Sequence, residues 1–463
     1  MQKLYHQKLN TYLVILFLSG SQVLDAQKTF SAEQCVQYAF VHNPLLQASS
    51  TDTAISDLDI KRVTGLYYPR VNFGTAFQYY ISKRNLLVEG GTTLAPATVP
   101  PGEPYAIPTG YHNSWFPTLS VNQLIFDPSY RNSYNIASQN RVLQQQEIAD
   151  FKIGLVTGIY KAYSACKLLE VQATFLEQNI NRIDTLIELT RTKFKEGAGI
   201  KIEVNRVEVT GNRMRGELAN VRNSYAEAML GLQFQMNYLE QDSMILSDAF
   251  SVPDIVSAAD PIMRELLLGN PERRIESQIL KTQIAMADES IKLERARKQI
   301  SIGADGSLGF TPAANSVGKI FQGERWKPYS YIGVNLFVPI FNGMDVNRAV
   351  EQKKLQASQV RNYFDQFTNQ FENERQAVFF QIKNAKEKFL FAEKNLRLAE
   401  NNIYLLQEAF VNGVADSQDL ILGENDLYEN QARYYNELLQ LLLSQIEGHQ
   451  VAGGYNRIVG LSN

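Results

Sequence analysis

The chain has 463 residues, of which 44% are hydrophobic and 20% are charged, so it contains ample apolar material for a packed core. Its formal net charge is −3, which gives no indication of nucleic-acid binding. Beyond the N-terminus no apolar run approaches about 18 residues, so we expect no transmembrane helix.

Residues 1–26 have the pattern of a secretory signal peptide. Lys3 and Lys8 precede the apolar run 12–18, and small and polar residues continue to Ala26, in the order that such peptides share. We expect cleavage after Ala26. The alternative is a short transmembrane anchor, but the apolar run is too short to cross a bilayer.

The expected mature chain opens with a helix and continues into a β-hairpin. Ser31 can cap the helix, which bends or restarts at Asn43-Pro44. Within the hairpin at about 70–126, the strands expected from about 70 to 81 and from about 115 to 126 alternate between apolar side chains and small or polar ones, the period of a strand with one apolar face. Segment 83–111 is rich in proline and glycine, so a long irregular loop is expected there.

A very long helix is predicted at about 129–195 and another at about 202–239. A glycine-rich turn at Glu196–Gly199 separates them as a helix C-cap. Together with the preceding elements, these helices make a first structural repeat, residues 27–240. The irregular segment 241–259 is interpreted as a connector.

The same order recurs in the second structural repeat, residues 260–463. A helix carries Asn270-Pro271, as the first helix carried Asn43-Pro44. A hairpin is expected at about 299–341. Two helices follow, at about 343–412 and about 417–450, before a C-terminal tail.

The helix at about 343–412 carries the clearest pattern. Apolar residues recur at intervals of three and four over more than six heptads, which predicts a helix packed along other long helices as in a coiled coil. At 1.5 Å per residue it is about 100 Å long. The apolar seam consists of Phe364, Phe367, Phe371, Val378, Ile382, Ala385, Phe389, Ala392, Leu396, Ala399, Ile403, Leu406 and Phe410.

The two repeats align over their turns and strand ends. Ile125-Phe126 corresponds to Ile340-Phe341, and the turn Phe194-x-x-Gly197 corresponds to Phe410-x-x-Gly413, at nearly the same offset. Because breaks, strands and turns keep their order, we interpret the chain as an internal duplication.

This order of elements predicts an α+β membrane protein. Four strands of about ten residues, each apolar on one side, suit tilted strands that cross an outer membrane with the apolar side towards lipid. Four strands cannot close a barrel and would leave open edges in hydrocarbon, whereas three chains would supply twelve strands. The alternative of an ordinary β-sandwich is disfavoured because the flanking helices are too long for so small a sheet.

Aromatic residues gather near the strand ends that flank the loops, which predicts an interfacial aromatic girdle. Its members are Tyr79, Tyr80, Trp115, Trp326 and Tyr329.

With these features the chain resembles the TolC-like outer membrane efflux protein family. The resemblance rests on the two Asn-Pro helices, the two hairpins and the paired turns 194–197 and 410–413, and it covers nearly all of the expected mature chain. It implies a homotrimer with a twelve-stranded outer membrane β-barrel and a long periplasmic α-helical coiled-coil barrel. It also implies docking onto a periplasmic adaptor (membrane fusion) protein and an inner-membrane pump of the RND, ABC or MFS type.

The resemblance further implies a periplasmic pore constriction. The family has an acidic ring six residues beyond the turn glycine, and the matching positions are Asp419 and Glu203. A second family aspartate falls on Leu422, for which the nearby Asp416 could substitute. The alternative is that Asp419 and Glu203 are ordinary first-turn carboxylates favoured by the helix dipole.

The two turns are expected to form the tips that dock onto the adaptor. A tyrosine–arginine latch known in the family falls on Phe410 and Ala415, so that latch is absent or rebuilt. The expected docking residues are Phe194, Gly197, Ala198, Gly199, Phe410, Gly413, Val414 and Ala415.

No catalytic motif or metal-ligand spacing is found, and the four histidines are scattered, so we expect neither an enzyme nor a bound cofactor or metal. Cys35 and Cys166 fall in different helices and are either buried small hydrophobes or a disulfide of an exported protein. The expected function is the outer membrane exit duct of a tripartite efflux pump for small molecules. A type I protein-secretion duct and a secreted coiled-coil scaffold or adhesin without a pore are the alternatives.

Overall fold

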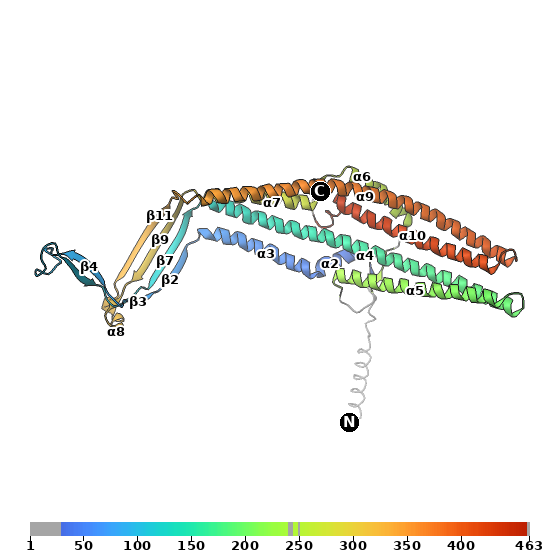
Figure 1. Ribbon diagram of the computed structural model, residues 1–463, viewed down its shortest axis with the longest axis horizontal. Coiled ribbons are helices and arrows are strands. Elements are labelled where there is room, and N and C mark those ends of the chain that lie inside the picture. The colour runs from blue at the N-terminus through green and yellow to red at the C-terminus, as the bar shows by residue number, and fades with distance from the viewer. Residues whose placement is uncertain (1–28, 239–243, 249–250, 461–463) are drawn as a thin grey trace, which may run out of the picture. The chain divides into compact units, whose positions relative to one another are not determined.

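The computed structural model describes residues 29–238, 244–248 and 251–460 (Figure 1). The signal peptide expected at 1–26 and part of the expected connector 241–259 lie outside the described residues. The chain divides into two compact units. The helical unit comprises the chain up to Thr51, Gln145–Ile279 and the chain from Phe364, whereas the strand unit comprises Asp52–Gln144 and Leu280–Tyr363.

The helices follow the predicted order, except that α6 (Val252–Leu267) begins within the segment 241–259 that was expected to be an irregular connector. The first series is α2 (Ala32–His42), α3 (Pro44–Thr64), α4 (Ser129–Lys195) and α5 (Lys201–Met236), and the second is α6 (Val252–Leu267), α7 (Ile275–Ala296), α9 (Asp345–Val411) and α10 (Ser417–Ala452). Both α4 and α9 have 67 residues, and both α5 and α10 have 36. None of the described helices is both long and apolar enough to span a membrane.

The two Asn-Pro pairs start helical turns in the same way. The Asn43 Oδ1 accepts a hydrogen bond from the Leu45 N–H at 2.9 Å, and the Asn270 Oδ1 accepts one from the Glu272 N–H at 2.9 Å. In each pair the proline occupies the first helical position, where its missing N–H costs nothing. The asparagine therefore caps the turn that its proline begins.

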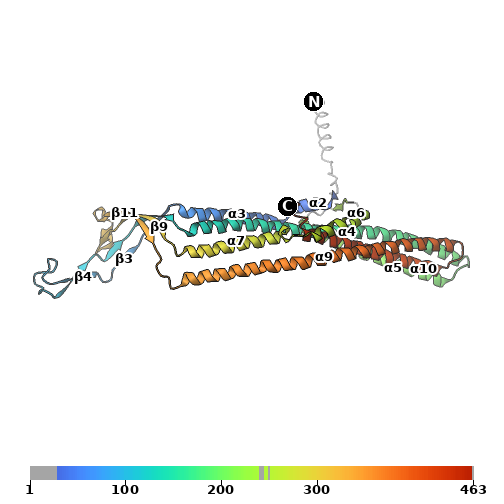
Figure 2. The same ribbon diagram turned by 90° about the horizontal axis from the view of Figure 1, so that it is seen from above.

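The apolar seam of α9 is confirmed. Ten of its thirteen residues are buried, and Phe364, Phe367 and Leu406 are half-buried. In the helical unit the seam faces α4, α5 and α10 through two hydrophobic clusters, and α5 and α10 lie side by side there (Figure 2). Burial of this continuous apolar seam stabilises α9 against the helices that it contacts.

A third cluster of the helical unit contains both cysteines. Cys35 and Cys166 are fully buried, free thiols. Burial raises the pKa of Cys35 to about 12 and that of Cys166 to about 11. The two thiols therefore act as small apolar side chains rather than as a disulfide. A two-residue parallel pair, β1 (Thr29–Phe30) with β8 (Ile245–Leu246), borders this cluster and was not predicted.

A four-stranded antiparallel sheet dominates the strand unit. Its strands are β2 (Arg70–Gly74), β7 (Thr118–Phe126), β9 (Ser301–Phe310) and β11 (Pro328–Phe337), in the spatial order β11-β9-β7-β2. The two predicted hairpins are thus joined through β7 and β9, and β2 and β11 are left as the two edges.

The sheet has one apolar and one polar face, as the alternation predicted. Residues paired across neighbouring strands point to the same side of a sheet, and the register places Phe73 beside Leu119 and Leu119 beside Leu308. The polar face carries Asn72, Ser120 and Ser307 in the next row. Within the chain the apolar face has no cover, since its large side chains are exposed: Val71, Phe73, Leu119, Val121, Leu308, Ile332, Val334 and Leu336.

Two predicted strands are wrong in detail, because each is interrupted. The strand expected from about 70 to 81 divides into β2 and β3 (Phe77–Tyr79), which belong to different sheets. The strand expected from about 115 to 126 divides at Phe116-Pro117 into β6 (Asn113–Trp115) and β7. Proline has no N–H to donate to a ladder, which accounts for the second interruption.

The loop expected at 83–111 is not irregular throughout. It contains the hairpin β4 (Arg84–Glu89) and β5 (Pro104–Thr109), paired from Arg84–Thr109 to Glu89–Pro104. Prolines are tolerated in β5 because the ladder has only two strands and one side of each remains unpaired. The second loop contains β10 (Ala313–Ala314), which pairs with β6, and the short helix α8 (Val317–Ile320).

Candidate functional site

The two turns at the ends of the long helices have the same geometry. Gly197 and Gly413 have φ of 77° and 75°, the left-handed conformation that glycine adopts without strain. The Ala198 N–H donates to the Lys193 carbonyl at 2.9 Å, and the Val414 N–H donates to the Ala409 carbonyl at 2.8 Å. Each glycine is thus the C-terminal cap of its helix, and the exposed tips include Ala198 and Val414.

The helices that follow these turns begin differently. Asp416 caps α10, because its Oδ1 accepts from the N–H groups of Gln418 at 2.8 Å and Asp419 at 2.9 Å. The Asp419 Oδ2 accepts in return from the Asp416 N–H at 3.1 Å, which completes a capping box. Glu203 occupies the first turn of α5, whose N-cap, Ile200, has no side-chain cap. Within a single chain, the capping box is sufficient to explain why Asp416 and Asp419 occupy these positions. Both side chains remain exposed.

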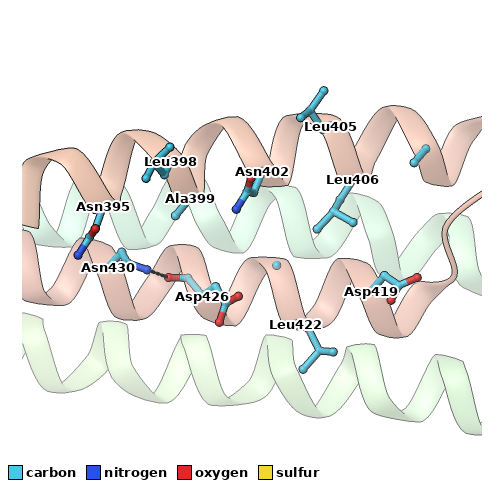
Figure 3. A pocket seen from close by; sticks show the side chains of 12 residues that line it. Asn395, Leu398, Ala399, Asn402, Leu405, Leu406, Asp419, Leu422, Asp426 and Asn430 are labelled. Carbon is cyan, nitrogen blue, oxygen red and sulfur yellow. Dashed lines mark hydrogen bonds between the residues drawn. The ribbon is translucent and has the colours of Figure 1, made fainter.

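Asp419 and Leu422 line a groove of about 850 Å³ between α9 and α10 in the helical unit, whereas Glu203 and Asp416 do not line it. Figure 3 shows the polar residues of this groove, with Asn395 and Asn402 on α9 and Asp426 and Asn430 on α10. Leu422 also lines a second groove, of about 490 Å³, between α5 and α10. We did not predict Asp426, although it lies one heptad after Asp419, and that spacing was the available signal.

A buried polar network joins α4 to α10. Arg182 on α4 donates to Glu424 on α10 through Nε at 3.3 Å and Nη2 at 3.5 Å, and its Nη2 also donates to Asn179 Oδ1. The Asn179 Nδ2 donates to the Gln431 Oε1 at 2.6 Å. Burial raises the pKa of the Glu424 carboxyl, and Arg182 offsets that effect only in part. We did not predict this network. Glu424 and Gln431 lie one heptad apart on α10, and polar residues at that spacing were the available signal.

Phe410 and Ala415 occupy the positions of the family's tyrosine–arginine latch, and Phe410 instead contacts a lysine. Phe410 is buried, and the Lys193 Nζ lies 3.8 Å from its ring centroid, so a cation–π contact joins α4 to α9 at the tip. The equivalent Phe194 is 42% exposed, with the Lys201 Nζ 5.9 Å from its ring centroid. The two predicted tips therefore share backbone geometry but differ in packing.

The expected girdle residues lie in the strand unit around a packed aromatic cluster. The ring centroids of Trp115 and Trp326 are 5.1 Å apart, and Phe310 and Phe321 contact this pair. The Tyr329 hydroxyl lies 3.2 Å from that of Thr118, while Tyr79 stacks on His112. The Tyr80 hydroxyl donates to Gln78 at 2.6 Å.

Among the described residues, no group of three or more His, Cys, Asp or Glu side chains could hold a metal ion.

Comparison with known proteins gives a family match over part of the chain and a fold over most of it. Residues 35–237 match the family model described as outer membrane efflux protein. No functionally curated protein matches the chain. The matching solved structures share only about an eighth of their residues with it, so they establish the fold alone.

Three of these structures illustrate the match. The CusC channel has 12% identity and a TM-score of 0.69, with 92% of each chain covered. The outer membrane protein VceC from Vibrio cholerae has 13% identity and a TM-score of 0.65, with 91% of this chain and 96% of that chain covered. The Campylobacter jejuni CmeC outer membrane channel has 13% identity and a TM-score of 0.67, with 91% and 85% covered. The predicted resemblance to the TolC-like outer membrane efflux protein family is therefore confirmed, by the family model over residues 35–237 and by the fold over the described chain.

Proposed function

We propose that this chain is the outer membrane channel of an efflux system and that it works as a homotrimer. The observation that carries the proposal is the exposed apolar face of the four-stranded sheet. Eight large apolar side chains on that face have no cover within the chain, an arrangement that suits contact with lipid and would favour aggregation in water. The family description supports an efflux channel over the alternative of a protein-secretion duct.

The two open edges of the sheet support assembly into a closed barrel. Each of the three strand pairs is antiparallel, so the edge strands β2 and β11 also run in opposite directions. The β11 edge of one copy can therefore pair with the β2 edge of the next in an antiparallel ladder, which satisfies backbone groups that would otherwise be unpaired in hydrocarbon. Three copies give a twelve-stranded barrel, and the equal lengths of α4 and α9 and of α5 and α10 support an internal duplication.

In this proposal the long helices continue below the outer membrane into the periplasm as a helical coiled-coil barrel. The tips at Gly197 and Gly413 dock onto a periplasmic adaptor protein, and an inner-membrane pump supplies energy. The chain itself performs no catalysis and exports small molecules passively. Its polar sheet face would line the water-filled lumen.

The proposal is tested by recording from planar bilayers that contain the purified protein. We expect stable single-channel conductance steps and a trimer mass by light scattering in detergent. A secreted scaffold or adhesin without a pore would give no conductance. A monodisperse monomer after extraction from outer membranes would contradict the assembly, because it would leave both sheet edges open.

A second prediction concerns the constriction. In a trimer, Asp419 and Glu203 would bring six carboxylates to the periplasmic end, where like charges attract multivalent cations. The double variant Asp419→Asn, Glu203→Gln keeps an acceptor for the capping box while it removes the charges. We expect block by a trivalent cation on the periplasmic side to weaken roughly tenfold and cation selectivity to fall. Single-channel recording measures both.

The matched control is Glu196→Gln, which removes an exposed carboxylate from the tip without touching the groove. Its cation block should stay close to that of the wild type. Unchanged block in the double variant would mean that Asp419 and Glu203 are ordinary first-turn carboxylates of their helices.

A further inference from the structure

A small polar pocket lies where the β3 and β6 strands meet the β4–β5 hairpin in the strand unit. Its volume is about 170 Å³, and Lys83 and Arg84 supply its charged lining. The other lining residues are hydroxyl-bearing or glycine: Tyr80, Thr109, Gly110, Tyr111 and Ser114. No acidic side chain lines the pocket, so its electrostatic potential favours an anion.

The walls of the pocket are held by hydrogen bonds. The Tyr80 N–H donates to the His112 carbonyl at 2.7 Å, and the Thr109 hydroxyl donates to the Arg84 carbonyl at 3.0 Å. Arg84 and Thr109 are also partners in the β4–β5 ladder. Both walls of the pocket are therefore held in place by hydrogen bonds to the backbone, and Lys83 and Arg84 line the same pocket.

A third cation borders the pocket. The Arg325 guanidinium carbon lies 5.7 Å from the ring centroid of Tyr111, and its Nη1 donates to the Ala313 carbonyl at 3.1 Å. None of Lys83, Arg84 and Arg325 forms an ion pair with a described residue, not even Arg325 with the adjacent Glu324. We name these three cations the basic patch. A cation whose charge no carboxylate neutralises can attract an anionic ligand.

The neighbourhood of the basic patch selects the kind of anion. Ser114, a pocket residue, is followed by Trp115, whose indole packs against Trp326 and Phe321. Amphipathic rings of this kind concentrate at the boundary between hydrocarbon and headgroups. The apolar sheet face ends beside this aromatic cluster, where β9 ends at Phe310, a ring that packs on Trp326. Cations next to such a cluster are at the depth of lipid phosphates.

We propose that the basic patch binds the phosphate of a lipid headgroup at the membrane surface. Lys83 and Arg84 donate to the phosphate oxygens, with Arg325 on the far side of Tyr111 as a second electrostatic contact. The bound phosphate would hold the lipid beside the aromatic cluster of Trp115 and Trp326. This inference rests on the proposed function, because it requires the sheet to span an outer membrane.

The test uses the full-length protein in mixed micelles, titrated with a phosphorylated glucosamine glycolipid and with its dephosphorylated form. Wild type should prefer the phosphorylated lipid, and the double variant Lys83→Gln, Arg84→Gln should bind it roughly tenfold more weakly. The matched control Lys353→Gln, Lys354→Gln removes two charges from α9 in the same unit and should bind like wild type. Trimer mass and conductance are measured for every variant.

Equal affinity of the Lys83→Gln, Arg84→Gln variant and wild type would overturn the proposal, as would equal affinity for the dephosphorylated lipid. Displacement of the lipid by an equal concentration of inorganic phosphate would overturn its assignment to a lipid site. A wild-type protein without conductance would instead contradict the proposed function, so the two failures are distinguishable.

Discussion

Replacing Arg182 with methionine is expected to destabilise the helical unit by about 3 kcal/mol, because it leaves the Glu424 carboxylate buried without a cation. The Glu424 side chain is only 3% exposed, and Arg182 is its one cationic partner among the described residues. Methionine keeps most of the apolar volume of the arginine stem. The loss in the free energy of unfolding therefore measures the effect of removing the positive charge. Urea unfolding followed by circular dichroism measures it.

The same helical unit contains a matched control. Arg222 pairs with Glu177 at 2.7 Å, but both side chains are largely exposed. Water solvates the remaining carboxylate in Arg222→Met, so we expect a loss of at most about 1 kcal/mol. If the two variants lost the same stability, the Arg182–Glu424 pair would not behave as a buried pair.

The effect of Arg182→Met should depend on pH in a defined direction. Burial raises the pKa of Glu424 above its ordinary value of 4.5, and removal of Arg182 raises it further. A carboxyl with a raised folded-state pKa stabilises the fold while it is protonated, and that stabilisation is lost as the pH rises from 4.5 through the folded-state pKa. The penalty of Arg182→Met should therefore be largest at neutral pH and shrink towards pH 4.5. In Arg182→Met, Glu424→Gln the penalty should lose its pH dependence.

The second large effect is expected at Ile332, whose side chain is 92% exposed on the apolar face, midway along the edge strand β11. A lysine at the midplane of a membrane barrel costs about 2–4 kcal/mol. Ile332→Lys should therefore lower the stability of the protein folded in lipid vesicles by that amount, as measured by denaturant unfolding.

Ser307→Lys is the matched control for Ile332→Lys. Ser307 pairs with Tyr331 on the opposite face of the same sheet, one row away from Ile332. A lysine that faces a watery lumen should be tolerated, so this variant should lose little stability. A β-sandwich that covered the apolar face with another sheet would also reject lysine at 332.

A direct measurement of lipid contact distinguishes a membrane barrel from a β-sandwich in which protein covers the apolar face. Brominated lipids should quench a fluorophore attached at Ile332→Cys and leave one at Ser307→Cys unchanged. The absence of quenching at 332 would mean that protein, rather than lipid, covers the apolar face.

The sequence by itself determined the type and order of most elements. Long helices and strands differ in the period of their apolar residues, and this period is a local property of the chain. The α9 seam was therefore readable from Phe371 to Phe410, and glycines 197 and 413 marked the helix ends because few other residues adopt positive φ. The polar and apolar sheet faces were readable for the same reason.

Only the tertiary structure decided which elements pair and which side chains meet. The β7–β9 pairing joins strands almost 200 residues apart, and no local period specifies such a partner. Proline cannot donate a backbone N–H to a strand ladder. The interruption at Pro117 and the prolines of the hairpin at 84–109 therefore depend on which backbone N–H groups the neighbouring strands require. Phe194 and Phe410 occupy equivalent places in the sequence, yet one is exposed and the other buried, since each packs against a different neighbour.

The charged residues show the same division. Asp419 and Glu203 were recognisable as possible first-turn carboxylates, because a helix N-terminus attracts them through its own N–H groups. The Arg182–Glu424 pair was not recognisable, because its partners lie on helices α4 and α10 and only their packing excludes water from the carboxylate. Burial is a property of the assembled helices, and therefore the pKa of Glu424 could be derived only from the tertiary structure.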